Sequence, residues 1–321
     1  MRAIVCYRYG GPENLELREI EQPSPADSEI LVRVRASSVN PVDWHLMRGQ
    51  PFLARMIFGG LFRPKRTRLG RDLAGVVEAV GAAVTTFKPG DEVFGHAPGA
   101  YAEFVIATED QIERKPANLS FDAAAAVPIA GVTAVQALRD VAKLKAGQRL
   151  LVNGGSGGVG SFAVQIGKAW GAGVSAVTST RNVERVRALG AGEVVDYERE
   201  DFVAGGRRYD VVFDNVGNRS DAELARVTVP GGVVVVNGGA GNTAQIVLGT
   251  LVTAVRNRRS PVQFKSFLSR PNRDDLAVLR DLIEAGAVRP LIDRSYRLEE
   301  IREAVRYAET FHTRGKLVIE I

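Results

Sequence analysis

Gly154-Gly155-Ser156-Gly157-Gly158-Val159-Gly160 is the stretch that decides the fold of this chain. An apolar strand pattern over residues 149–153 precedes it, and a helical pattern over 162–170 follows it. Three of its glycines fit G-x-G-x-x-G, in which one glycine makes a tight turn, one lets the backbone approach a pyrophosphate, and one lets the helix pack on its strand. The stretch therefore predicts a dinucleotide site with the diphosphate at a helix N-terminus.

The cofactor-binding residues predicted from this turn are Gly155, Ser156, Gly157, Gly158, Val159 and Gly160. A phosphate-binding P-loop is the rival interpretation, and it requires Lys and then Ser or Thr after its last glycine. Here Ser161 and Phe162 follow the last glycine, so the P-loop is excluded.

The end of the next predicted strand, residues 174–178, bears on which dinucleotide is bound. About 20 residues past the glycines, an NAD-specific fold carries an Asp or Glu that binds the ribose 2′-hydroxyl. This chain has Ser179 there, with Arg181 two residues on and no acid before Glu184. A small hydroxyl leaves room for a 2′-phosphate, and a guanidinium can neutralise it, although Arg181 also fits an ordinary solvated residue at a helix start. The segment favours NADPH over NADH.

Composition indicates a two-domain enzyme of ordinary polarity. The 321 residues are 45% apolar and 25% charged, and no window approaches the roughly 20 apolar residues of a membrane helix. The one cysteine, Cys6, excludes an internal disulfide framework and any multi-cysteine metal site. We expect a cytoplasmic protein.

The net charge of +5 raises the question of a polyanionic partner. Basic residues gather in two places, 63–71 and 256–259, but neither has the aromatic interleaving or motif of a nucleic-acid module. We therefore expect no nucleic-acid partner, because a mild positive field also suits an anionic cofactor or substrate.

The secondary-structure pattern of the sequence divides the chain into two domains. Residues 1–120 are strand-and-turn material, whereas 121–267 alternate strand and helix, with strands at 149–153, 174–178, 193–195, 210–213, 233–236 and 262–267. That alternation predicts an α/β fold with a doubly wound parallel sheet. The tail, with helices at 274–285 and 298–311 and strands at 293–297 and 316–321, should rejoin the first domain because short strands need a sheet. The predicted domains are 1–120 with 268–321, and 121–267.

Several further segments carry a family resemblance over the whole length: Val39-Asn40-Pro41-Val42-Asp43, Gly70-Arg71-Asp72-Leu73-Ala74-Gly75, Lys88-Pro89-Gly90-Asp91, Ala100-Tyr101-Ala102-Glu103, Ala130-Gly131-Val132-Thr133-Ala134, Leu189-Gly190-Ala191 and Gly315-Lys316. With the glycine stretch, they resemble the medium-chain dehydrogenase/reductase superfamily, in its zinc-independent quinone oxidoreductase-like branch. The resemblance implies a GroES-like catalytic domain from the two chain ends, a central Rossmann NADP(H)-binding domain, a small hydrophobic acceptor and a homodimer.

The same resemblance bears on zinc. Zinc-dependent relatives hold catalytic zinc with Cys, His, and Cys or Asp, where this chain has Asn40, Arg71 and Ala130. A structural zinc lobe needs four closely spaced cysteines, and the three histidines, His45, His96 and His312, suggest no replacement site. We expect no zinc, and hence no Lewis acid to polarise a carbonyl. The acceptor should then be a quinone or an activated alkene.

Three residues are the catalytic candidates. Asn40 replaces a zinc ligand and could donate to a substrate oxygen, although it also fits a turn residue before proline. Asp43 is an orienting partner or a helix cap. His45 stands where many quinone reductases of this branch carry Tyr, and is either a proton shuttle or a solvated loop histidine.

Other residues extend the predicted cofactor site. Asn215 and Asn237 each end a core strand, at the sheet edge where open α/β sheets bind ligands. Tyr197 flanks the adenine side or is buried. The resemblance adds Thr133 near the nicotinamide half, which also fits a helix position facing the sheet, Ser266 and Phe267 at the carboxamide, and Lys316 at the adenosine phosphate.

Two apolar runs, 52–62 and 248–255, are flanked by basic residues. We expect them to line an acceptor pocket or to pack as ordinary helices, with a membrane-surface contact for an isoprenoid quinone as the lesser alternative. The predicted activity is NADPH-dependent hydride transfer to a quinone or α,β-unsaturated carbonyl. The alternatives are an enoyl-thioester reductase and a crystallin-like NADPH-binding protein with little turnover.

Overall fold

The computed structural model describes residues 1–50, 55, 60–237 and 260–321. Most of the apolar run at 52–62, all of the run at 248–255 and the basic residues 256–259 lie outside this part. The chain forms two compact units, one of residues 1–132, 271–285 and 290–321, the other of residues 133–270 and 286–289. Among the helices of the described residues, none combines the length and the apolar character that a membrane span requires.

The second unit contains a six-stranded sheet in which every pair is parallel. Its strands are β8 (Arg149–Asn153), β9 (Gly173–Thr178), β10 (Glu193–Asp196), β11 (Tyr209–Asp214), β12 (Thr228–Val236) and β13 (Gln263–Ser266). Their spatial order is β10-β9-β8-β11-β12-β13. In chain order this is 3-2-1-4-5-6, the order of the dinucleotide-binding fold. The predicted Rossmann sheet is confirmed.

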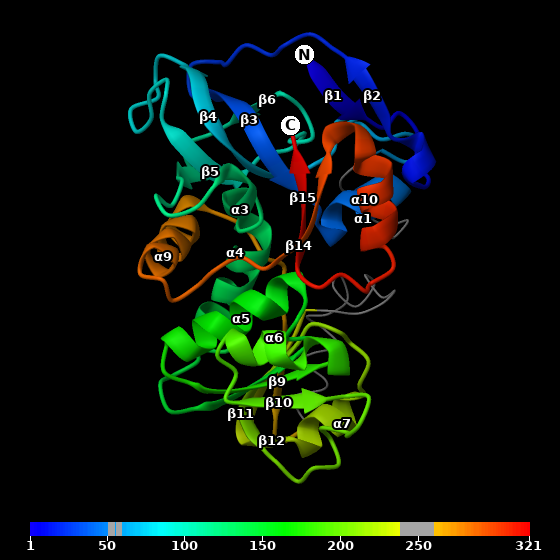
Figure 1. Ribbon diagram of the computed structural model, residues 1–321, viewed down its shortest axis with the longest axis vertical. Coiled ribbons are helices and arrows are strands. Elements are labelled where there is room, and N and C mark those ends of the chain that lie inside the picture. Colours follow the sequence, from blue (N-terminus) through cyan, green and yellow to red (C-terminus); the bar gives the residue numbers. More distant parts are fainter. Residues whose placement is uncertain (51–54, 56–59, 238–259) are drawn as a thin grey trace. The chain divides into compact units, whose positions relative to one another are not determined.

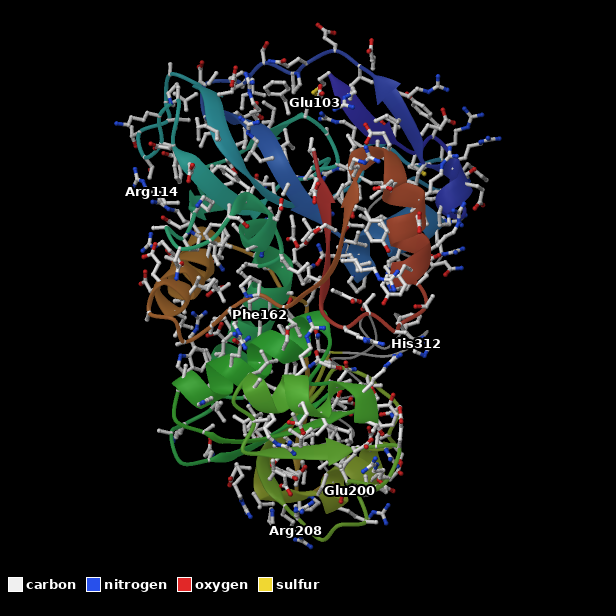
Figure 2. The ribbon with its side chains drawn as sticks, viewed as in Figure 1. Glu103, Arg114, Phe162, Glu200, Arg208 and His312 are labelled. Carbon is white, nitrogen blue, oxygen red and sulfur yellow. The ribbon has the colours of Figure 1, made fainter. Side chains whose placement is uncertain are left out.

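The helices of this unit cover the sheet because their apolar faces need burial. They are α5 (Gly158–Ala169), α6 (Val183–Ala188) and α7 (Asp221–Arg226), with the short turns η3 (Ala137–Val141) and η4 (Thr180–Asn182). On α5, Phe162 and Ile166 are fully buried. Figure 2 shows Phe162 inside this unit, whereas Glu200 and Arg208 project outward from its loops.

The first unit is built on a mixed seven-strand sheet. Its strands, in spatial order, are β14 (Ile292–Arg297), β15 (Lys316–Glu320), β3 (Ile30–Ser38), β4 (Asp72–Val80), β5 (Glu92–His96) and β7 (Ile112–Arg114), with β6 (Phe104–Ala107) also pairing with β3. A two-stranded sheet of β1 (Arg2–Val5) and β2 (Glu16–Glu19) stands beside it. The C-terminal strand β15 pairs antiparallel with β3, so the predicted return of the tail is confirmed (Figure 1).

The helices of the first unit are α1 (Pro41–Arg48), α3 (Phe121–Ala125), α4 (Pro128–Gln136), which runs on into the second unit, α9 (Arg273–Glu284) and α10 (Ile301–Ala308), with η1 (Pro12–Asn14) and η5 (Leu298–Glu300). The alanine-rich α3 packs against β3, β4 and β15. This packing places α3 in the first unit, which runs past the boundary predicted after residue 120. Buried Glu113 on β7 fastens α9 through ion pairs of 2.7 Å with Arg273 and with Arg280.

Candidate active site and cofactor site

The glycine turn between β8 and α5 is held by close backbone contacts. Gly154 makes the bend with φ of +87°, a conformation that favours glycine. A Cβ on Gly155 would lie 2.8 Å from the Cβ of Ala176 on β9, and a Cβ on Gly160 would lie 2.1 Å from the carbonyl oxygen of Gly154. Glycine is required at both positions because the helix approaches the turn and the neighbouring strand so closely.

Gly157 is glycine for a different reason. A Cβ added there would meet only the Gly154 carbonyl oxygen, at an ordinary contact distance of 3.5 Å. The protein itself leaves room at this residue, which is the N-cap of α5. The first N–H groups of any helix have no intrahelical partner and carry positive charge density. A side chain here would fill space that a diphosphate at this helix end would need, so the turn fits the expected cofactor.

At the carboxyl edge of the sheet, one side-chain amide has a hydrogen-bond donor without a partner among the described residues. Asn215 accepts a hydrogen bond of 2.8 Å from the Asn237 side chain, which fixes which end of its amide faces away. The Asn215 Nδ2 atom is buried and has no partner among the described residues. Buried donors are normally satisfied, so this orphan donor fits an acceptor group on a bound cofactor. Both asparagines lie at the predicted edge.

The end of β9 and its neighbours carry three of the predicted cofactor residues. Ser179 is buried, with its hydroxyl in a hydrogen bond from Asn182, and Arg181 is exposed. Tyr197 follows β10 and is 58% exposed, so the alternative of a buried Tyr197 does not hold.

Three further predicted cofactor contacts lie in two settings. Thr133 is buried within α4. Ser266 is exposed at the carboxyl end of β13, and Phe267 behind it is half-buried. These placements agree with a ligand at the carboxyl edge only for Ser266 and Phe267, since buried Thr133 also fits a helix position facing the sheet.

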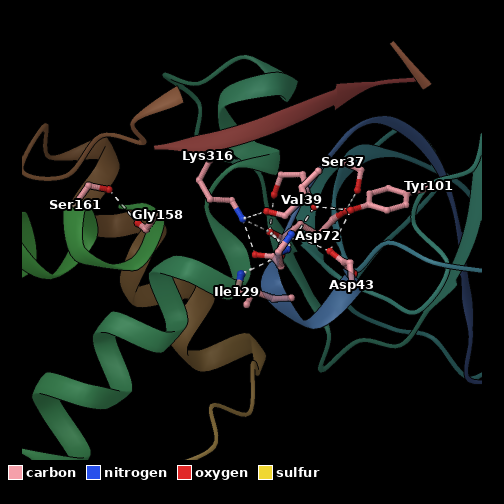
Figure 3. Close-up of polar contacts among 11 residues, drawn as sticks. Ser37, Val39, Asp43, Asp72, Tyr101, Ile129, Gly158, Ser161 and Lys316 are labelled. Carbon is pink, nitrogen blue, oxygen red and sulfur yellow. Dashed lines mark hydrogen bonds and ion pairs between the residues drawn. The ribbon is translucent and has the colours of Figure 1, made fainter. Parts of the chain in front are cut away.

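The first unit corresponds to the predicted GroES-like catalytic domain, and we call it the catalytic unit. It encloses a buried ion pair beside Asn40. The Lys316 Nζ atom lies 2.5 Å from Asn40 Oδ1, 3.0 Å from the Val39 carbonyl oxygen and 3.3 Å from Asp72 Oδ2 (Figure 3). Lys316 is 4% exposed and Asp72 is 0% exposed. We call Asn40, Asp72 and Lys316 the buried ion cluster.

This geometry shows where Lys316 lies. Its ammonium has three acceptors within the first unit, in the buried ion cluster, and the contact predicted with the adenosine phosphate of a cofactor stays a prediction. The physical reason is that a buried ammonium needs an opposite charge, and Asp72 at the start of β4 supplies it.

The buried ion cluster also takes up the side chain of Asn40. The Asn40 amide nitrogen donates to Asp72 Oδ2 at 2.8 Å and to the Ser38 carbonyl at 3.4 Å. Both amide hydrogens have acceptors in the protein, and the side chain is buried. Both hydrogens are therefore used within the protein in this structure, and donation from Asn40 to a substrate oxygen stays a prediction.

Asp43 lies beside this cluster at the start of α1. Its Oδ2 atom accepts from the Asn40 backbone N–H at 2.9 Å and from the Tyr101 hydroxyl at 3.1 Å, whereas Oδ1 is buried without a partner among the described residues. Burial, with a smaller contribution from the Asp72 charge, raises the pKa of Asp43 to about 6. The contact with the Asn40 N–H is the helix cap that the sequence allowed.

His45 stands apart from the buried ion cluster, one turn further along α1. Its ring lies against that of Trp44, with centroids 3.8 Å apart and the planes tilted by 32°, and its Nδ1 atom is buried with no partner among the described residues. Burial lowers the pKa of His45, with Glu309 opposing the effect. A neutral imidazole with an unused nitrogen can accept or donate a proton.

Two family models match the chain, an alcohol dehydrogenase GroES-like domain over residues 26–117 and a zinc-binding dehydrogenase over residues 189–319. The NADPH-dependent alkenal/one oxidoreductase of Arabidopsis thaliana chloroplasts is 35% identical over 99% of this chain and 79% of its own length. The chain belongs to the medium-chain dehydrogenase/reductase superfamily, in its quinone oxidoreductase-like branch.

Solved structures agree with this placement. The quinone oxidoreductase from Coxiella burnetii matches with a TM-score of 0.87 and 33% identity, covering 100% of this chain and 99% of the other. The Escherichia coli quinone oxidoreductase, solved with NADPH, matches with a TM-score of 0.83 and 25% identity over 100% of both chains. The chain is accordingly an oxidoreductase.

Some residues that contact the candidate site residues escaped sequence reasoning. Asp72 and Tyr101 were visible only as parts of family segments, and Asn182 had no signal beyond its place after Arg181. An ionised residue at the start of an otherwise apolar strand was a usable sign at two places, Asp72 before Leu73 and Lys316 before Leu317. Buried charges rarely occur unpaired, so each of these two residues indicated a nearby partner of opposite charge.

The raised pKa of Asp43 has a consequence for stability. Between the unfolded value of 3.8 and about 6, the folded protein binds the proton more tightly than the unfolded chain. The contribution of Asp43 therefore stabilises the fold as pH falls through this window and is lost as pH rises through 6. Asp43→Asn should remove this pH dependence, which amounts to about 2–3 kcal/mol over the whole window.

Urea unfolding midpoints measured from pH 4 to pH 7 check this expectation. Asp27→Asn is the matched control, because Asp27 is exposed and its side chain has no partner among the described residues. An Asp43→Asn protein whose stability still falls across the window as steeply as the wild type would show that another group titrates there.

Proposed function

We propose that the protein is an NADPH-dependent, zinc-independent reductase that transfers hydride to a quinone or an α,β-unsaturated carbonyl. The observation that carries the proposal is the cofactor cradle, a glycine turn at the N-terminus of α5 beside a strand end that has Ser179 and Arg181 in place of an acid. The alkenal/one oxidoreductase and the E. coli quinone oxidoreductase with NADPH support the same assignment.

The bound dihydronicotinamide would supply the hydride, and the chain's own residues hold the cofactor for it. The first N–H groups of α5 would bind the diphosphate. Asn215 would give its unused amide hydrogen to an acceptor on the cofactor, and Ser179 with Arg181 would bind the 2′-phosphate.

On the acceptor side, negative charge develops on an oxygen as hydride is transferred, and a donor to that oxygen lowers the barrier. His45 is our candidate for this donor because its unused nitrogen and lowered pKa keep a neutral imidazole ready to exchange a proton. Asn40 and Asp43 would act through α1, which they fix at its first turn.

The metal-free part of the proposal rests on the residues at the ligand positions of zinc-dependent relatives. Asn40 at one of them is committed to the Lys316 ammonium, so a cation already occupies the Asn40 oxygen. In the described part of the chain, no group of three or more His, Cys, Asp or Glu side chains could hold a metal ion.

A homodimer, a cytoplasmic location and a hydrophobic small-molecule acceptor stay proposals of the same kind. The single cysteine, Cys6, is buried directly after β1, and a chain with one free thiol suits a reducing compartment. A nucleic-acid partner is not proposed.

Stopped-flow oxidation of NADPH tests the assignment. We expect bound NADPH to be oxidised by members of a panel of quinones and enones, with rates unchanged by a metal chelator. Saturated ketones serve as the control panel, since they need stronger polarisation than this site offers. NADPH that stays reduced with every quinone and enone, or activity lost with the chelator, would contradict the proposal.

The cofactor preference is a separate expectation. NADPH should bind at least about 10-fold tighter than NADH, equivalent to about 1.4 kcal/mol. Ser179→Asp should reverse much of this preference, because a carboxylate repels the 2′-phosphate and accepts from a ribose hydroxyl. Ser179→Asn is the neutral control of similar shape. Dissociation constants from fluorescence titration decide the matter, and a preference unchanged in Ser179→Asp would contradict it.

A further inference from the structure

A buried amide joins the glycine turn to the end of the second strand. Asn182 ends η4 and is 5% exposed. Its Nδ2 atom donates to Ser179 Oγ at 3.1 Å and to Ser156 Oγ at 3.3 Å. One side chain therefore holds two hydroxyls that come from different loops of the same sheet edge.

The direction of these hydrogen bonds is fixed by chemistry. An amide NH₂ group only donates, so both serine oxygens must accept from it. Ser156 Oγ also accepts from Thr178 Oγ1 at 2.9 Å. A hydroxyl has two acceptor positions and one donor hydrogen. Ser156 is thus left with only its hydrogen to offer, and Ser179 has its hydrogen available as well.

The charges around this sheet edge also favour an acceptor group with negative charge. The one hydrogen of Thr180 Oγ1 is shared between the nearby carboxylates of Asp196 and Glu198, at 2.6 and 2.9 Å. Asp196 also pairs with Arg199 at 3.3 Å. Arg181 is exposed and has no ion pair within the described residues. The acids therefore have partners, whereas two hydroxyl hydrogens and one guanidinium do not.

A set of donors with one cation fits a phosphate monoester, which offers only acceptor oxygens at neutral pH. It does not fit a ribose 2′-hydroxyl, whose own hydrogen needs an acceptor. We propose that Asn182 is a specificity-determining positioning residue, which turns the Ser156 and Ser179 hydroxyls into donors for the 2′-phosphate of the cofactor. The proposal rests on the NADPH dependence proposed above and names the residue that sets it.

Two variants separate this role from a general structural one. Asn182→Ala removes the donor, so the hydroxyls can rotate; the dissociation constant for NADPH should rise about 10-fold and that for NADH should change little. Asn182→Asp keeps the shape but accepts from the same hydroxyls, which reverses them and adds a negative charge. NADPH binding should then weaken by about 100-fold or more, again with little change for NADH.

The experiment is a fluorescence titration of the full chain with NADPH and with NADH, with thermal unfolding of each variant recorded in parallel. Ser175→Ala is the matched control: its hydroxyl lies on the same strand β9 but bonds Glu193 at 3.2 Å. It should keep the wild-type preference. If Asn182→Ala does not fold, the isosteric Asn182→Asp carries the test.

The outcomes distinguish this proposal from the one it rests on. A wild-type protein that binds both nucleotides equally contradicts NADPH dependence, and the role of Asn182 with it. A wild type that prefers NADPH, with the preference intact in folded Asn182→Ala and Asn182→Asp, contradicts only the role of Asn182. Equal weakening of both nucleotides also overturns it, because the amide would then serve the turn and not the 2′-phosphate.

Discussion

Lys316→Met is expected to destabilise the catalytic unit by about 3–5 kcal/mol, because it leaves the Asp72 carboxylate buried without a cation. Asp72 is fully buried, and Asn40 depends on the same ammonium for its Oδ1 partner. Methionine nearly matches the lysine stem in volume, so the loss comes from the uncompensated charge and not from a cavity. Urea unfolding of the full chain measures it, with Trp44 reporting the catalytic unit and Trp170 the second unit.

The controls for this expectation use both partners of the pair. Lys316→Met combined with Asp72→Asn should recover a large part of the lost stability, since the second change removes the unpaired charge. Lys88→Met, at an exposed lysine of the same unit, should change stability little. If Lys316→Met unfolds at the wild-type midpoint, the ammonium does not hold the cluster in solution.

The fold followed from local patterns, which explains why it could be predicted. The strand, glycine turn and helix at residues 149–170 are contiguous in the chain, and the strand–helix alternation after them predicts parallel neighbours. The structure confirms each predicted strand of that sheet to within a few residues, with the widest difference at β12, which begins at Thr228. The tail was predicted from the need of short strands for a sheet, and β15 meets that need.

The catalytic candidates were predictable only in part. Asn40 and Asp43 lie together because they are close in sequence, at the first turn of α1. What they do depends on Lys316, which lies far along the chain and reaches them only because β15 pairs with β3. No local pattern carries that pairing. The same holds for Asn182, whose partner Ser156 lies in another loop.

Gly160→Ala is the second change from which a large effect is expected. The new Cβ would lie 2.1 Å from the Gly154 carbonyl oxygen and 3.1 Å from the Gly155 Cα, and both are backbone atoms of the turn itself. The helix can accommodate the methyl group only by moving away from the turn. We expect NADPH affinity to fall by more than about 100-fold, which corresponds to about 2.7 kcal/mol, together with a lower midpoint of unfolding for the second unit.

Gly157→Ala separates cofactor binding from stability at the same turn. Its φ of −75° suits alanine, and its Cβ would touch protein only at 3.5 Å. The folded state should therefore be as stable as the wild type, while the methyl group fills the space of the diphosphate and abolishes tight NADPH binding. Gly173→Ala, whose Cβ would find its nearest neighbour at 3.9 Å, is the control that should change neither property. If Gly157→Ala binds NADPH with wild-type affinity, the diphosphate does not lie against the N-terminus of α5, and the cofactor must be held elsewhere on the sheet edge.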